Sequence, residues 1–395
     1  MGEWKSFQVG EIGKVITGKT PKTSISDNYG GYIPFLTPSD DMSVKYVRKT
    51  AKTLTEKGLS EVKNAILPAN SVCVSCIGSD LGKVVITTRP TVTNQQINSI
   101  VVDEARFEIS FVYYAMRILG KKLNFISKTS TAVPIVNKSS FSSYEIECPS
   151  LKEQKQIAAV LSVLDAKIEC NRMINDNLEQ QAQAFFQELF IDNAGPEWVL
   201  GTISDLGAVV GGSTPSKAKP EYYTETGIAW ITPKDLSINK SKFISHGEND
   251  ITELGLKNSS ATIMPEGTVL FSSRAPIGYI AIAAGEVTTN QGFKSIIPKP
   301  EIGTAFVYYF LKYNLPIIEG MASGSTFKEV SGSTMKGVPA VIPDSDTITR
   351  FNDFCTPIFA QQRILEEQNQ SLAALRDNLL PKLMSGEIHV SGIQL

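Results

Sequence analysis

The sequence of 395 residues is poor in the side chains that build most catalytic and metal sites. It has two histidines, His246 and His389, and five cysteines. Cys73 and Cys76 form a Cys-x-x-Cys pair, but no second Cys or His pair follows at the spacing that zinc requires, so both are expected in a core or strand. The two halves of the chain share no pair of general acid and base residues. We therefore expect no catalytic residues and no metal ligands here.

Long apolar runs are also missing. The longest, such as 279–284, falls far short of the roughly 20 residues that a membrane helix needs. The first five residues, MGEWK, do not begin a secretory signal. An odd number of cysteines without a regular framework is typical of a reducing compartment. We expect a cytoplasmic protein with no membrane segment.

Strong positive charge is the third absence. The formal net charge is −2, which argues against coating nucleic acid by bulk electrostatics. The charge is uneven, however. Residues 1–150 hold 18 Lys and Arg against 13 Asp and Glu, whereas residues 191–345 hold 12 against 15. Any polyanion must therefore be bound by local patches or with the help of a basic partner.

What the sequence does have is an internal repeat. Residues 93–100 read TNQQINSI and residues 289–296 read TNQGFKSI, with five of eight positions identical. Further matches keep the same order at offsets of 194 to 197: TGKTP at 17–21 with GGSTP at 211–215, IPFLTPSD at 33–40 with IAWITPKD at 228–235, LP at 67–68 with MP at 264–265, and FVYY at 111–114 with FVYY at 306–309. Chance matches would keep neither order nor offset, so we predict two copies of one unit.

Each copy is predicted to be a mixed α/β domain that ends in a long helix, which makes the fold α+β. β-branched runs such as 71–74 and 84–86 are bounded by turn residues and predict strands, whereas the FVYY windows have helical spacing. Ser150 and Glu153 form a capping box at a helix start. We expect domains at 1–150 and 191–345, and helices at 151–190 and 346–395, the first roughly 60 Å long.

Apolar residues in both helices alternate at spacings of four and three, which predicts an antiparallel coiled coil related by pseudo-twofold symmetry. A polar Asn in such a seam fixes register. The predicted seam residues are Leu161, Leu164, Ile168, Asn175, Leu178, Leu365, Asn369 and Leu372. The alternative is that both helices pack on ordinary domain cores and that their Asn side chains are solvated.

Residues 13–20, GKVITGKT, match the phosphate-loop pattern. That loop must lead into a helix whose N-terminus holds the phosphates. Here Pro21 is followed by a polar loop, and the second copy has Ser213 at the position of Lys19. An ATP-using enzyme is therefore disfavoured, although a basic loop that contacts a phosphate backbone remains a possible role.

Loops in both copies are rich in Ser, Thr, Asn, Gln and Lys, groups that suit phosphate oxygens and base edges. Two similar modules held by rigid helices fit a bipartite target on one DNA duplex. The candidate DNA-binding residues are Lys19, Thr20, Lys22, Ser39, Arg89, Gln96, Asn98, Lys128, Ser213, Thr214, Lys217, Lys234, Arg274, Lys294 and Lys328.

Residues identical in both copies cannot explain how two modules read different half-sites. We therefore predict structural roles for Asn94, Gln95, Asn290 and Gln291. Discrimination is expected where the copies differ: Gln96 against Gly292, Asn98 against Lys294, Lys19 against Ser213, and Ser39 against Lys234.

Over essentially its whole length the chain resembles the specificity subunit of type I restriction and modification systems. The resemblance rests on GSTPS at 212–216, AWITPKDL at 229–236, the two TNQ phrases, and PSLKEQKQI at 149–157. It implies two target-recognition domains that each read half of an interrupted sequence in double-stranded DNA. It also implies two spacer helices that set the gap and contact the modification subunits.

The resemblance assigns catalysis to partners. Two modification subunits would carry adenine methylation with S-adenosylmethionine, and motor-nuclease restriction subunits would use ATP and magnesium, so this chain would bind no cofactor. Two departures are a Phe35 where the second copy has Trp230, and a second helix without the Glu-Gln found at 153–154. The residues alone leave open a duplicated two-headed protein or glycan adaptor, which salt-dependent binding to duplex DNA would distinguish.

Overall fold

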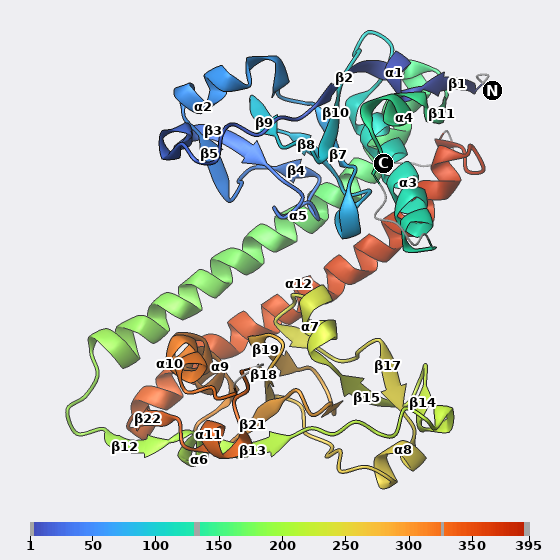
Figure 1. Cartoon of the computed structure of the whole chain (residues 1–395). Coiled ribbons are helices and arrows are strands. Elements are labelled where there is room, and N and C mark those ends of the chain that lie inside the picture. The colour runs from blue at the N-terminus through green and yellow to red at the C-terminus, as the bar shows by residue number, and fades with distance from the viewer. Residues whose placement is uncertain (1–3, 130–134, 325–327, 391–395) are drawn as a thin grey trace. The chain divides into compact units, whose positions relative to one another are not determined.

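The computed structural model describes residues 4–129, 135–324 and 328–390 (Figure 1). The chain forms two compact units. Unit 1 consists of Met1–Cys170 with Asn369–Leu395, and unit 2 consists of Asn171–Gln368. Each unit contains one copy of the repeat and one segment of each of the two long helices, α5 (Leu151–Gln187) and α12 (Ser345–Met384).

Unit 1 contains a five-stranded sheet, a four-stranded sheet and a short ribbon. The five-stranded sheet has the order β2 (Gly13–Thr17), β10 (Ile97–Val102), β7 (Val72–Ser75), β8 (Val84–Thr87) and β4 (Tyr46–Val47). The four-stranded sheet has the order β5 (Lys52–Leu54), β3 (Tyr29–Leu36), β9 (Thr91–Thr93) and β6 (Ile66–Leu67). The ribbon pairs β1 (Lys5–Gln8) with β11 (Glu145–Cys148), and the shorter helices are α1 (Val9–Ile12), α2 (Glu56–Glu61), α3 (Ile109–Thr129) and α4 (Lys138–Ser143).

Unit 2 repeats the topology of the five-stranded sheet and of the ribbon, whereas its four-stranded sheet differs in the edge strands. Its five-stranded sheet has the order β13 (Gly207–Gly211), β21 (Lys294–Pro298), β18 (Val269–Ser273), β19 (Ile277–Ala283) and β16 (Phe243–Ile244). Its second sheet has the order β14 (Tyr223–Thr224), β17 (Asn249–Ile251), β15 (Ile228–Ile231) and β20 (Thr288–Thr289), and its ribbon pairs β12 (Val199–Thr202) with β22 (Pro339–Ile342). The shorter helices are α6 (Ile203–Leu206), α7 (Pro233–Ile238), α8 (Glu253–Lys257), α9 (Thr304–Tyr313), α10 (Leu315–Gly320) and α11 (Gly332–Lys336). The predicted duplication of a mixed α/β domain is confirmed.

The aromatic repeats form the centre of each core. The FVYY stretches lie in α3 and α9, as their spacing predicts. In unit 1, α3 packs against β7 and β8; in unit 2, α9 packs against β18 and β19. Phe111, Tyr114, Phe306 and Tyr309 are all buried. Because burial of one such side chain is worth about 1.5–3 kcal/mol, these residues fix one helix on each five-stranded sheet.

The long helices begin where the sequence predicts, but one ends earlier. The N–H of Glu153 donates to the Ser150 hydroxyl (3.3 Å) at the start of α5, which continues beyond Gln187 as a π-helical turn to Asp192. The second helix was expected over 346–395, yet it ends at Met384, so that prediction is wrong. Gly386 has a φ of +73°, a left-handed conformation that ends helices and favours glycine.

In unit 2 the two helix segments pack antiparallel. The side-chain N–H of Asn171 donates to Gln368 Oε1 (3.3 Å), and that of Gln362 donates to the Asn175 carbonyl (3.2 Å). Farther along α5, the ring of Phe185 packs on Phe354, with centroids 4.5 Å apart. As residue numbers rise along α5 they fall along α12, which confirms the predicted antiparallel pairing.

The predicted seam residues differ in burial. Leu161, Ile168 and Leu365 are buried, whereas Leu164, Asn175, Leu178, Asn369 and Leu372 are partly buried. In unit 1, Leu161 belongs to the same core as Leu380 and Leu383 of α12. Each helix segment therefore contributes both to the helix pair and to the core of its unit, but Asn171 is buried and not solvated as the alternative required.

Residues that resembled catalytic motifs have structural roles. The chain after Thr20 passes through Pro21 and reaches a 3-10 turn at Ser26–Asn28, so no helix follows the phosphate-loop pattern to hold a phosphate. Cys73 and Cys76 are buried, and burial raises the pKa of both thiols. The described residues contain no cluster of His, Cys, Asp and Glu suited to a metal ion. Within the same residues, no helix is both long and apolar enough for a bilayer.

Candidate nucleic-acid interface

In unit 1, three polar loops meet at one edge of the two sheets. Strands β3 and β9 run parallel, so their ends at Leu36 and Thr93 lie side by side, and the Asn94 N–H donates to the Leu36 carbonyl (3.0 Å). The loop after β2 joins them through Lys19, whose N–H donates to the Thr93 carbonyl (2.9 Å). We call residues 18–22, 37–41 and 94–96 the loop edge of unit 1.

Unit 2 builds the same edge with the same backbone contacts. Strands β15 and β20 are also parallel and end at Ile231 and Thr289. The Asn290 N–H donates to the Ile231 carbonyl (3.0 Å), and the Ser213 N–H donates to the Thr289 carbonyl (2.8 Å). Residues 212–217, 232–235 and 290–292 form the loop edge of unit 2.

The repeated asparagines close turns at this edge. Asn94 Oδ1 accepts the N–H of Gln96 (3.1 Å), and Asn290 Oδ1 accepts the N–H of Gly292 (2.8 Å). Such a bond between a side chain and the backbone two residues on mimics a backbone turn. The structural role predicted for both asparagines is therefore confirmed.

The repeated glutamines connect two of the three loops. Gln95 Oε1 accepts a hydrogen bond from the Thr20 hydroxyl (2.5 Å), and Gln291 Oε1 accepts one from the Thr214 hydroxyl. Both glutamines are exposed, so the bonds hold the loop edge without burying it. Thr20 and Thr214, which were candidates for DNA contact, thus use their hydroxyl groups to hold two loops together.

A glycine is required where two loops cross. A Cβ atom at Gly212 would lie 2.0 Å from the carbonyl oxygen of Asn290 and 2.4 Å from that of Thr289. At Gly18 it would lie 2.1 Å from the carbonyl oxygen of Asn94. Backbone atoms cannot yield at such distances, which explains the glycine shared by TGKTP and GGSTP.

The Thr-Pro-x-Asp repeat stabilises the loop at 37–41 in unit 1 and the loop at 232–235 in unit 2. Asp40 Oδ2 accepts the N–H (2.7 Å) and the hydroxyl (2.9 Å) of Thr37. Asp235 Oδ2 accepts the same two groups of Thr232, at 2.7 and 2.6 Å. Both carboxylates are buried, so these repeated acids position backbone and are not available to a ligand.

The difference between Phe35 and Trp230 also has a structural reason. Tyr29 donates to the Pro21 carbonyl and stacks edge-on against Phe35, with ring centroids 6.2 Å apart. In unit 2, Tyr223 makes the equivalent contact with Trp230, at 5.7 Å. The indole N–H of Trp230 additionally donates to the Ser213 carbonyl (3.0 Å). Phenylalanine has no such donor, so Phe35 cannot make this additional hydrogen bond to the loop of unit 1.

Several predicted DNA-binding residues are exposed at the loop edges. In unit 1 they are Lys19, Lys22 and Ser39, and in unit 2 they include Lys217 and Lys234. Lys19 and Lys22 line a shallow cavity of about 380 Å³ together with Gln95. Gln96 is partly exposed, and its side-chain oxygen accepts a hydrogen bond from Asn94. These side chains differ between the copies.

Other candidates lie elsewhere. Asn98 is 2% exposed; its Oδ1 accepts the Thr17 hydroxyl (2.6 Å) and its Nδ2 donates to the Val136 carbonyl (3.1 Å), so the prediction of a DNA contact is wrong for this residue. Arg89 precedes β9 and lies at the opposite end of that strand from the loop edge. The side chain of Lys128 is outside the described part of the chain, and Lys328 is exposed beside Glu329.

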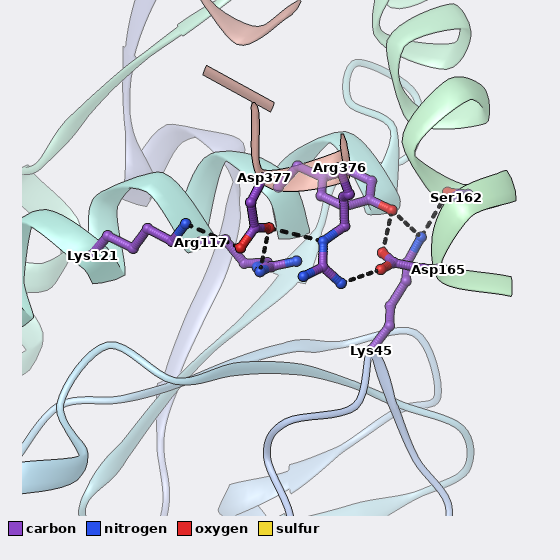
Figure 2. Close-up of polar contacts among 8 residues, drawn as sticks. Lys45, Arg117, Lys121, Ser162, Asp165, Arg376 and Asp377 are labelled. Atoms are coloured by element: carbon purple, nitrogen blue, oxygen red, sulfur yellow. Dashed lines mark hydrogen bonds and ion pairs between the residues drawn. The ribbon is translucent and has the colours of Figure 1, made fainter. Parts of the chain in front are cut away.

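A charged cluster that attaches unit 1 to its helix segments was not predicted (Figure 2). The Lys45 side chain is only 8% exposed, and its Nζ donates to the Ser162 hydroxyl of α5 (2.7 Å). Tyr114 of α3 donates to Asp165 Oδ2 (2.5 Å), and Arg376 of α12 donates to Asp165 Oδ1 (2.7 Å). Burial lowers the pKa of Lys45 to about 8. We call these five residues the helix junction of unit 1.

A second carboxylate extends this cluster. Asp377 lies 2.9 Å from Arg376 Nε, 3.2 Å from Arg117 and 3.5 Å from Lys121 (Figure 2). Burial raises the pKa of Asp377, but the surrounding cations, Arg376 first, lower it overall. Arg117 and Lys121 belong to α3, so the cluster connects α3 with α12 inside unit 1.

Unit 2 has an equivalent helix junction, in which the carboxylate belongs to Glu179 of α5. Lys242 Nζ lies 2.5 Å from Glu179 of α5 and donates to Gln362 Oε1 of α12 (2.6 Å). Tyr309 donates to Glu179 (2.8 Å), and Lys312 lies 2.5 Å from the same carboxylate. Burial would raise the pKa of Glu179, but the two lysines lower it to about 2.

The two junctions share a lysine and a tyrosine. Lys45 and Lys242 precede β4 and β16 and are 197 positions apart (242 − 45). Tyr114 and Tyr309 are the last residues of the FVYY repeats. A repeat search restricted to charged and hydroxyl residues would have found both pairs, because they keep the offset of the other matches.

Comparison with known proteins supports this reading of the fold. The family model described as "Type I restriction modification DNA specificity domain" matches residues 1–180 and again residues 196–375. The MjaIX specificity subunit of Methanocaldococcus jannaschii is 41% identical over 46% of this chain and 44% of that subunit. The HindI specificity subunit of Haemophilus influenzae is 23% identical over 98% of this chain and 100% of that subunit.

Among solved structures, the S subunit of a type I restriction-modification system from M. genitalium has a similar fold. The TM-score is 0.55 at 18% sequence identity, covering 97% of this chain and 96% of that one. The two matches to the family model together span most of the sequence, the first mainly in unit 1 and the second mainly in unit 2. The chain therefore belongs to the type I restriction-modification DNA specificity family and carries the domain of that family twice.

Proposed function

We propose that each unit reads one half of a bipartite sequence in double-stranded DNA through its loop edge. One observation carries the proposal: the two edges have the same backbone hydrogen bonds but different exposed side chains. Shared residues such as Asn94 and Asn290 hold the loops, whereas Ser39 and Lys234 stand at matching exposed positions with different chemistry. A common scaffold with variable tips suits two readers of different sequences.

We assign phosphate contacts to the exposed lysines. Lys19 and Lys22 in unit 1 and Lys217 in unit 2 present ammonium groups on loops, where they can neutralise backbone phosphates. Gln96 and Lys234 have groups that suit base edges. These lysines give local positive charge to a chain whose net charge is −2.

We also propose that α5 and α12 set the spacing of the half-sites and dock two modification subunits. Exposed apolar side chains on these helices, namely Val163, Met173, Ile364 and Leu375, fit a protein partner better than solvent. The modification subunits would carry S-adenosylmethionine and methylate adenine, and restriction subunits would use ATP and magnesium. The chain itself would bind no cofactor, catalyse no reaction, and bind its target DNA in the cytoplasm.

Binding to duplex DNA at increasing salt tests the proposal. We expect the complex with a modification subunit to lose affinity linearly in log salt, with a slope set by the number of phosphates contacted. Lys19→Ala should weaken binding to all sequences equally and reduce the slope by about 0.9. Lys14→Ala is the matched control, because Lys14 is an exposed lysine near the other end of β2. It should change neither the affinity for DNA nor the salt slope.

Two results would contradict the proposal. One is a complex that binds no duplex DNA, as the protein or glycan adaptor would show. The other is binding to duplex DNA with an affinity that does not depend on salt. Loss of ATP hydrolysis on Lys19→Ala with intact DNA binding would instead support an enzyme built on residues 13–20.

A further inference from the structure

Each loop edge continues into a second cluster of loop positions, built on the same backbone contacts in both units. In unit 2 the Ser273 N–H at the end of β18 donates to the Gly292 carbonyl (2.7 Å), and the Val330 N–H donates to the Ser273 carbonyl (3.0 Å). In unit 1 the Cys76 N–H donates to the Gln96 carbonyl (2.8 Å), and the Val136 N–H donates to the Cys76 carbonyl (2.9 Å). The residues within two positions of these contacts are therefore structurally matched between the units.

The matched positions carry different chemistry. In unit 2 they hold Arg274, Lys294 and Glu329, all charged. In unit 1 the same places hold Ile77, Asn98 and Ile135, at offsets of 197, 196 and 194. Ile77 and Ile135 form an antiparallel bridge, and Ile135 is 66% exposed. Two charged residues of unit 2, Arg274 and Glu329, therefore correspond to two apolar residues of unit 1.

The three charged side chains of unit 2 form a chain of contacts that starts at the repeated TNQ phrase. Lys294 Nζ lies 3.4 Å from the Gln291 carbonyl oxygen and 3.6 Å from Glu329 Oε1. Glu329 Oε2 in turn lies 3.5 Å from Arg274 Nη1. Lys294 is the least exposed of the three, and Arg274 is the most exposed. The arrangement anchors a lysine and orients a partly exposed guanidinium.

The strength of these contacts suits a residue that must exchange partners. Ion pairs this long and partly exposed are weak, so Arg274 can leave Glu329 for a better acceptor. One carboxylate between two cations leaves a net charge of +1, which favours DNA. Guanine presents O6 and N7 as adjacent acceptors in the major groove, and a guanidinium can bond to both at once.

We infer that Arg274 reads a guanine in the half-site of unit 2, with Glu329 and Lys294 as positioning residues. The inference rests on the proposed function and assigns a base to one residue in the cluster beside the loop edge of unit 2. The apolar pair Ile77 and Ile135 gives unit 1 no guanine-reading donor at the matching position. Contact with the methyl group of thymine is the chemistry that this pair offers.

Binding of the complex to duplexes with every base at each position of both half-sites tests this assignment. Arg274→Ala should reduce the preference for guanine at one position of one half-site by roughly 5- to 150-fold, which corresponds to about 1–3 kcal/mol. Preferences in the other half-site should not change. Glu329→Gln should reduce the same preference for guanine by a smaller factor. Arg274→Gln should also reduce the preference for guanine, which shows that the effect of Arg274→Ala is not a folding defect caused by alanine.

Lys299→Ala is the matched control, because Lys299 is exposed and follows the other end of β21. It should leave every base preference unchanged. Arg274→Ala weakening all sequences equally, with a salt slope lower by about one, would identify a phosphate contact and overturn the inference. An unchanged guanine preference would overturn it too. A wild-type complex with no sequence preference in either half-site would instead overturn the proposed function.

Discussion

Glu179→Gln is expected to destabilise unit 2 by about 3 kcal/mol at pH 7. The pKa of Glu179 falls from 4.5 to about 2, a shift of roughly 2.5 units at 1.36 kcal/mol each. The Glu179 side chain is 22% exposed, so solvent screens it little. The substitution also leaves Lys242, 6% exposed, without its carboxylate, and an unpaired buried charge is costly.

The pH dependence of this effect has a definite sign. Because the folded-state pKa lies below the unfolded value, the stabilisation is fully present above about pH 4.5 and is lost as pH falls towards 2. The difference between wild type and Glu179→Gln should therefore shrink below pH 4.5. Urea unfolding between pH 2 and 7 measures it, with Trp198 and Trp230 as the fluorescent reporters within unit 2.

Glu367→Gln is the matched control on the same pair of helices. Glu367 is 62% exposed and pairs with Arg363 of α12 at 3.1 Å, so its removal should cost less than about 1 kcal/mol. If Glu179→Gln and Glu367→Gln lowered the free energy of unfolding equally, the helix junction of unit 2 would not be what holds the domain on its helices.

Lengthening both long helices by one heptad is expected to widen the gap between the half-sites by about three base pairs. Asn171 bonds to Gln368, so insertions after these two residues lie level with each other. Seven residues keep the seam in phase and add roughly 10 Å of helix. At about 3.4 Å per base pair, this predicts the wider gap. Mapping of methylated adenines in cells that carry the variant measures the gap directly.

A single insertion provides the control for this experiment. Seven residues added to α5 alone leave α12 without a matching turn, so this variant should lose the native site without gaining a longer one. An unchanged gap in a folded and active double-insertion variant would show that the helices do not set the spacing.

The sequence predicted the fold because its informative features are local and repeated. Matches at a constant offset revealed the duplication, and four-three spacing revealed both long helices. The structural role of Asn94 followed from its identity in the second copy, and the turn to Gln96 confirms it. The early end of α12 was missed because the effect of Gly386 depends on its left-handed backbone conformation.

Tertiary contacts were harder to predict. A lysine is normally a surface residue, so nothing in the local sequence marks Lys45 or Lys242 as buried partners of a helix. Asn98 differed between copies and looked like a reading residue, yet it bonds to Thr17 and Val136 inside unit 1. Arg274 and Glu329 lie 55 residues apart (329 − 274), and only the fold brings them together.

Sequencing of methylated adenines in DNA from cells that carry this chain and its modification subunit tests the central claim most directly. The account predicts one bipartite motif, with two short defined segments separated by a gap of fixed length. In cells with Arg274→Ala, only one of the two segments should lose a guanine. An uninterrupted motif, or a variant that alters both segments, would contradict the claim that each unit reads its own half of the site.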